Sequence, residues 1–205
     1  DGDLQNEPED IPRLVEAVTE QAKQLWHVSN LYGSPQAERL AERLCAASFA
    51  DVVFFANSGA EAMECAIKMA RKYQAANSQP ERYRIITFEG AFHGRTLATL
   101  AAGGNEKYLE GFGPRVEGFD QVPLGDLEAV KRVMTKDTAA ILIEPLQGEG
   151  GVRMAPQAFF KALRDLCDEH DMLLLFDEVQ TGMGRTGEMF GYQKTGVVPD
   201  AMSLA

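Results

Sequence analysis

The chain has 205 residues, of which 45% are hydrophobic and 25% charged, a composition typical of a folded domain with one sizeable core. Its net charge of −11 argues against nucleic acid or an anionic membrane surface as a partner, because both would repel it. Three widely spaced cysteines without a CxxC pair predict neither a disulfide framework nor a metal site. These cysteines fit a reducing cytoplasm, so we expect a cytoplasmic protein. No apolar run is long enough to span a bilayer, and no signal peptide is recognisable.

Helix and strand patterns alternate along the chain after an acidic lead-in, residues 1–12, that we expect to be irregular. The predicted elements are helices at 14–26 and 36–47, a strand at 51–56, a helix at 60–76, a strand at 83–89, a helix near 127–134, a strand at 139–144, a helix at 157–170 and a strand at 172–177. Because the strands are continuously apolar and separated by helices, the fold class is α/β, with a mainly parallel sheet flanked by helices.

The most apolar of these strands ends in an acid, Asp177, at the start of the segment "FDEVQTGMGRTG". The carboxyl ends of parallel strands line the crevice where α/β proteins bind ligands. A carboxylate buried there without a partner would be costly, so a cationic partner is implied.

The segment "ANSGAEA", residues 56–62, stands where the predicted strand turns into a helix. Amides at a helix start favour a phosphate, and Gly59 and Ala60 leave room for one. A purely structural interpretation also holds, since Ser58 and Glu61 have the spacing of a capping box.

Two further strand ends carry polar or aromatic residues. The first, "FHGR", places Phe92 and Arg95 where they could stack on a flat ligand and clamp a carboxylate, although a core phenylalanine and a surface arginine would look the same. We expect His93 to be a structural hydrogen-bonding residue. The second, "EPLQGEGG", has two acids, Glu144 and Glu149, around a glycine turn; paired acids also occur in glycosidases, but then the other motifs would have no role.

Together the four strand ends describe a site for a planar cation that carries a phosphate, and pyridoxal 5'-phosphate (PLP) is such a molecule. Its phosphate would bind Ser58, Gly59 and Ala60, and its ring would lie against Phe92. Asp177 would face the pyridine nitrogen and keep it protonated, which makes Asp177 the candidate catalytic residue.

The motifs "NSGAEA", "FHGR", "EPLQGEGG" and "FDEVQTGMGRTG", in this order, resemble the large domain of the class III, fold-type I aminotransferases over residues 13–205. The resemblance implies a PLP-binding large domain that is incomplete, because the family's small C-terminal domain is absent. It also implies roles for Gly59 and Ala60 on the phosphate, Phe92 and Val179 on the two ring faces, Gln180 at the phenolic oxygen, and Arg95 and Glu149 at the substrate.

Within the family, "FHGR", "GEGG" and "LWHVSNLY" resemble the branch that acts on acetylornithine. This implies transfer of the terminal amine of N-acetylornithine to 2-oxoglutarate, giving N-acetylglutamate semialdehyde and glutamate in arginine biosynthesis, by a homodimer. Succinylornithine, ornithine and 4-aminobutyrate remain alternative substrates.

The family's Schiff-base lysine is expected directly after Ala205, so we expect the 205 residues alone to be inactive. Two other interpretations stay open: a cofactor-binding or dimerising scaffold without turnover, and an unrelated α/β binding domain.

Overall fold

The structure is a computed structural model that describes residues 8–29 and 31–205, and the chain divides into two compact units at Arg43 and Leu44. The first contains a 3-10 helix (Pro8–Asp10), α1 (Ile11–Ala22) and most of α2 (Pro35–Ala47). Residues 8–12 are therefore helical, which corrects the irregular lead-in over that part; residues 1–7 lie outside the described residues. The predicted domain boundary at residue 13 falls inside α1, and the sheet-bearing unit begins at Leu44.

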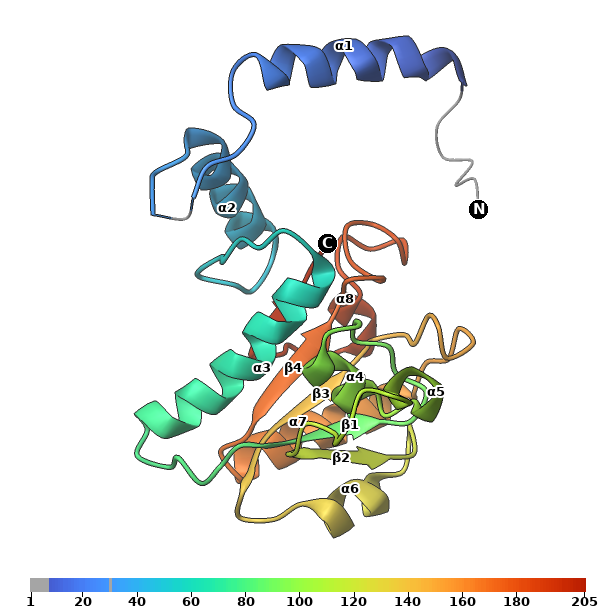
Figure 1. Ribbon diagram of the computed structural model, residues 1–205. Helices are drawn as coiled ribbons and strands as arrows, with labels where there is room; N and C mark the ends of the chain where they lie inside the picture. Colours follow the sequence, from blue (N-terminus) through green and yellow to red (C-terminus); the bar gives the residue numbers. More distant parts are fainter. Residues whose placement is uncertain (1–7, 30) are drawn as a thin grey trace. The chain divides into compact units, whose positions relative to one another are not determined.

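The second unit is built on a five-stranded parallel sheet in the order β2-β1-β3-β4-β5 (Figure 1). Its strands are β1 (Arg84–Phe88), β2 (Phe119–Val122), β3 (Thr138–Ile143), β4 (Leu173–Asp177) and β5 (Ala201–Ser203). Its helices are α3 (Gly59–Ala76), α4 (Leu97–Gly103), α5 (Glu106–Leu109), α6 (Leu127–Val133), α7 (Gln157–Glu169) and α8 (Tyr192–Thr195). The predicted α/β class with a mainly parallel sheet is confirmed.

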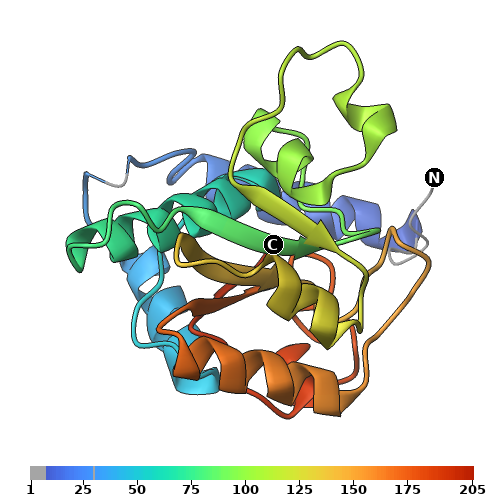
Figure 2. The same ribbon diagram turned by 90° about the horizontal axis from the view of Figure 1, so that it is seen from below.

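Helices cover both faces of the sheet, as Figure 2 shows. Alternate residues of the central strand β3 belong to different cores: Ile141 and Ile143 pack with α6 and α7, whereas Ala140 and Leu142 pack with α3. A strand buried on both faces has no polar side to display, which explains why β3 and β4 are continuously apolar in the sequence. Among the described residues, no helix has both the length and the hydrophobicity needed to cross a membrane.

The strand predicted at residues 51–56 does not form, and the segment runs as an extended loop into α3. Val52 is 84% and Phe54 67% exposed. Aromatic and β-branched residues favour a strand only where a neighbouring strand supplies a pleated surface, and the described sheet is complete without this segment. The prediction failed because it used composition alone.

Candidate functional site

The site lies at the carboxyl edge of the sheet, where the strands β1, β3 and β4 end in loops. Because the strands are parallel, these loops emerge at the same edge. The register pairs Ile143 of β3 with Phe176 of β4, so the next residues along, Glu144 and Asp177, follow at the same level. The sequence predicts this convergence, because the carboxyl ends of parallel strands lie at one edge of a sheet.

Asp177 is the last residue of β4 and is only 4% exposed. Its Oδ2 lies 2.7 Å from Nδ1 of His93, and its Oδ1 accepts the amide hydrogen of Val179 at 3.1 Å. A carboxylate offers about four lone-pair positions, so two accepted bonds leave capacity for a further donor. His93 is a hydrogen-bonding residue, as predicted, but its partner Asp177, 84 positions away, could not be predicted from the sequence.

The start of α3 forms the second part of the site. The Ser58 hydroxyl caps the helix by accepting the Glu61 amide hydrogen at 3.3 Å, and the Glu61 carboxylate accepts the Asn57 amide hydrogen at 2.6 Å. The structural interpretation of Ser58 is thus confirmed as an N-cap, although Glu61 reaches one residue further back than in a capping box. Among the described residues, the amides of Gly59 and Ala60 have no hydrogen-bond partner and are available to an anion.

Gly59 places this helix start against the loop that follows β4. A Cβ at Gly59 would lie 2.6 Å from Cγ1 of Val179, so only glycine fits without a shift. Val179 is half-buried and Gln180 is exposed. A Cβ added at Gly148 would meet Gln180 at 3.9 Å, which brings the loop after β3 to the same place.

The turn after β1 packs against the helix start as well. Gly94 has φ of +120°, and an added Cβ would lie 3.0 Å from Oγ1 of Thr99 and 3.3 Å from Cβ of Ala60. The left-handed conformation and this close packing both require glycine. The turn that carries the half-buried Phe92 is therefore packed against Ala60 at the start of α3.

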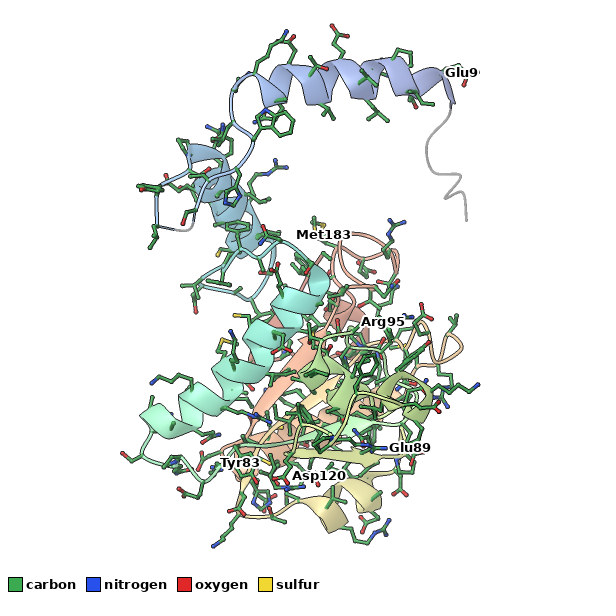
Figure 3. All side chains as sticks on the ribbon, viewed as in Figure 1. Glu9, Tyr83, Glu89, Arg95, Asp120 and Met183 are labelled. Carbon is green, nitrogen blue, oxygen red and sulfur yellow. The ribbon has the colours of Figure 1, made fainter. Side chains whose placement is uncertain are left out.

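Arg95 is exposed, and its guanidinium carbon lies 4.8 Å from the centre of the Tyr108 ring; Arg95 is labelled in Figure 3. Tyr108 also meets Phe92 edge-on, with the ring centres 6.4 Å apart. Tyr108 therefore contacts both Phe92, the proposed stacking residue, and Arg95, the proposed substrate residue. The sequence analysis missed Tyr108, and its one available signal was an aromatic residue in the short helix after "FHGR".

A cavity of about 370 Å³ opens beside this turn, and Phe92 and Glu149 both line it. The exposed Glu149 comes from the loop after β3, so the structure brings one proposed cofactor residue and one proposed substrate residue to the same cavity. Asp177 and the start of α3 are not part of its lining. The cavity extends over Gly104, Tyr108 and Gln121.

Two buried acids accompany Asp177. Burial raises the pKa of Glu144 to about 7, which His93 opposes and Asp177 reinforces. Burial also raises the pKa of Glu178, although that carboxylate accepts amide hydrogens from Gly191 at 2.5 Å and Tyr192 at 2.7 Å. Glu178 therefore ties α8 to the end of β4, a role that its position in the sequence did not indicate.

Comparisons of the sequence and of the structure with known proteins lead to one family. The sequence pattern of the class-III aminotransferases covers residues 9–205. The chain is 68% identical over 194 residues to acetylornithine aminotransferase 1 of Bradyrhizobium diazoefficiens, covering 95% of this chain and 48% of that protein. It is 54% identical over 194 residues to a Pseudomonas aeruginosa protein named succinylornithine transaminase/acetylornithine aminotransferase, with the same two coverages.

Solved structures of aminotransferases also resemble this chain. The crystal structure of N-acetylornithine aminotransferase from Stenotrophomonas maltophilia superposes with a TM-score of 0.78 at 43% identity, covering 98% of this chain and 49% of that one. The chain thus spans about half the length of the curated relatives it matches.

Proposed function

Since this chain belongs to the class-III aminotransferase family, whose members depend on PLP, we propose that its strand-end loops bind PLP in an enzyme that transfers an amino group. In the whole protein, the proposed reaction moves the terminal amine of N-acetylornithine to 2-oxoglutarate and yields N-acetylglutamate semialdehyde and glutamate. The observation that carries the proposal is the buried Asp177, which is held by His93 and by the amide of Val179, the residue that packs against Gly59 at the start of α3.

The described residues fit PLP on two counts. The amides of Gly59 and Ala60 suit the phosphate, because free N–H groups and the helix dipole both attract an anion. Asp177 suits the pyridine nitrogen, because a buried carboxylate with spare lone pairs stabilises a proton on the group opposite it. When bound, PLP supplies the electron sink for proton removal at the carbon that carries the amine.

The remaining site residues would orient the ring. Phe92 and Val179 are proposed to cover its two faces, since both are half-buried at this edge of the sheet. Gln180 is proposed to donate to the phenolic oxygen, and its exposed side chain leaves it free to do so. Ser58 contributes through its backbone, because its hydroxyl already caps α3.

Arg95 and Glu149 are the proposed substrate residues. A guanidinium binds a carboxylate with two parallel hydrogen bonds, and 2-oxoglutarate and glutamate each carry two carboxylates. Glu149 lines the cavity and offers the opposite charge, which suits an amine. The identity to relatives named for acetylornithine supports N-acetylornithine as the amine donor.

Succinylornithine is the second candidate donor, because the Pseudomonas aeruginosa relative carries both names. The two donors differ only in the acyl group on the distant amine. Ornithine and 4-aminobutyrate would lack that group altogether.

Amine-donor kinetics on the full-length protein test the substrate assignment. Initial rates would be measured with N-acetylornithine, succinylornithine, ornithine and 4-aminobutyrate, each with 2-oxoglutarate. We expect kcat/KM to be largest for N-acetylornithine, followed by succinylornithine. A preference for 4-aminobutyrate or for a plain α-amino acid would refute the assignment.

We also propose a cytoplasmic homodimer with small-molecule substrates and without nucleic-acid or membrane partners. The charge of −11 and the unpaired cysteines support the location and the lack of polyanionic partners. Exposed apolar side chains in the strand-end loops, Val152 at 74% and Met183 at 48%, support a covering subunit.

A further inference from the structure

Two buried acids hold two consecutive residues of the turn after β1. Glu144 Oε2 accepts the amide hydrogen of Phe92 at 3.1 Å, and Asp177 Oδ2 binds Nδ1 of His93 at 2.7 Å. Glu144 directly follows β3 and Asp177 ends the neighbouring strand β4, one residue beyond the paired Ile143 and Phe176. The turn that carries the proposed stacking ring is therefore attached at two points, one through its backbone and one through a side chain.

Both hydrogen bonds are made by buried side chains, so water cannot easily substitute for either of them. Glu144 is 4% exposed and His93 2% exposed. Among the described residues, Nε2 of His93 has no hydrogen-bond partner. Asp177 therefore supplies the one hydrogen bond to the His93 ring among the described residues, and a shift of the turn would break that bond.

The turn also has little freedom to adjust. Gly94 is in the left-handed region, and a Cβ at this position would lie only 3.0 Å from Oγ1 of Thr99 and 3.3 Å from Cβ of Ala60. A displacement of Phe92 would therefore press this turn against α3 or pull His93 from Asp177. Fixing the Phe92 amide consequently fixes both the ring and the imidazole that follows it.

We propose that Glu144 is a positioning residue: in its ionised form it anchors the Phe92 backbone, which keeps Phe92 in place for the cofactor ring and His93 on Asp177. The proposal rests on the proposed function, because it assigns Glu144 to the PLP site. The established family motifs contain this acid, but the contacts of its carboxylate are what carry the role.

The charge state of Glu144 changes near neutral pH, which makes the role measurable. Burial raises its pKa to about 7; His93 and the amides of Phe92 and Gly148 lower it, and Asp177 raises it further. Below that pKa the protonated carboxyl is a weaker acceptor for the Phe92 amide. PLP affinity should therefore fall as the pH drops from 8 to 6, and this fall should be smaller when Glu144 is replaced.

The test compares full-length wild type with Glu144→Gln, Glu144→Ala and the control Glu89→Gln. Glu89, labelled in Figure 3, is an exposed acid next to the same turn. Among the described residues, the bonds found at Glu89 are made by its backbone. The PLP dissociation constant would be measured by equilibrium dialysis between pH 6 and 8. Losing a hydrogen bond to a charged acceptor predicts that Glu144→Ala binds PLP roughly tenfold more weakly.

Glu144→Gln should retain an acceptor for Phe92 but lose the Glu144-dependent change of affinity between pH 6 and 8, whereas Glu89→Gln should retain it. Without cofactor, the contribution of Glu144 to stability should fall as the pH rises from about 4.5 to 7, because the folded carboxyl binds its proton more tightly than the unfolded one. The Tm difference between wild type and Glu144→Gln should therefore shift against wild type over this range.

Wild-type affinity and an unchanged pH profile in both Glu144 variants would overturn the proposal even if transamination is confirmed. Should both variants fail to fold, hydrogen exchange of wild type decides instead. After correction for the intrinsic rate, the peptide containing Phe92 should lose protection as the pH falls through 7, and constant protection would overturn the role. Substrate kinetics test the proposed function separately.

Discussion

At the scale of single residues, the position of Asp177 has the largest consequence. It is buried, bound to His93, and placed at the end of a strand, so removing its charge should affect chemistry more than folding. Asp177→Ala should lower the Tm by several degrees, because it removes the acceptor of two hydrogen bonds, those of His93 and the Val179 amide, at about 1–3 kcal/mol each. Transamination should fall by several orders of magnitude, because an unprotonated pyridine is a poor electron sink.

Steady-state kcat and thermal melts of the full-length protein would be compared for this variant and for Asp177→Asn, which retains the shape and removes the charge. Retention of most of the wild-type kcat by either variant would disprove the role of Asp177.

Gly59 and Val179 allow a second residue-scale prediction, because a Cβ at Gly59 would lie 2.6 Å from Val179. Overpacking of this kind costs about 1–3 kcal/mol, so Gly59→Ala should weaken PLP binding roughly tenfold. Adding Val179→Ala removes the clashing methyl groups and should restore part of the affinity. Gly148→Ala is the control, since its Cβ would meet Gln180 at an ordinary 3.9 Å.

The double-mutant cycle is read from four PLP dissociation constants. Strictly additive effects of the two substitutions would show that Gly59 and Val179 do not share the cofactor site in the way proposed.

At the scale of elements, Glu178 connects the end of β4 to α8 through two amides, those of Gly191 and Tyr192. Glu178→Ala would leave the buried Gly191 amide and the partly buried Tyr192 amide without an acceptor, and we expect a loss of about 3 kcal/mol or more of stability. Hydrogen exchange should increase over residues 190–196. The matched variant Glu188→Gln, in an exposed acid of the same loop, should change neither quantity. Equal effects of both variants would show that Glu178 does not hold α8 to the end of β4.

The sequence predicted those strands and helices whose own residues show a clear apolar pattern. β3 and β4 are continuously apolar because both faces are covered, and α3 and α7 have clear apolar periodicity. It missed β2, whose four residues FDQV mix polar and apolar types at the edge of the sheet. It wrongly predicted a strand at 51–56, since strand formation depends on a neighbour that local composition cannot reveal.

The candidate site divides in the same way. The strand ends and their glycine loops were predictable, because parallel strands bring their carboxyl ends together. The bonds from Asp177 to His93 and from Glu144 to Phe92 were not, as they join residues 84 and 52 positions apart. Pairings at that separation follow from sheet order and register, neither of which a single sequence displays.

At the scale of the whole molecule, exposed apolar residues in the strand-end loops lead to the prediction of a dimer. Val152, Met183 and Met189 are 74%, 48% and 42% exposed. Such side chains gather at interfaces, and the loops that carry them border the proposed site. Sedimentation velocity of the full-length protein at micromolar concentration should give a dimer. A monomer that retains full activity would contradict shared active sites.

The central claim is that the loops after β1 and β4, with the start of α3, form one PLP site. A crystal structure of the full-length protein with bound PLP tests this most directly. We expect the phosphate on the amides of Gly59 and Ala60, the ring between Phe92 and Val179, and the pyridine nitrogen within hydrogen-bonding distance of Asp177. A cofactor bound away from Asp177, or with its phosphate away from the start of α3, would contradict the claim.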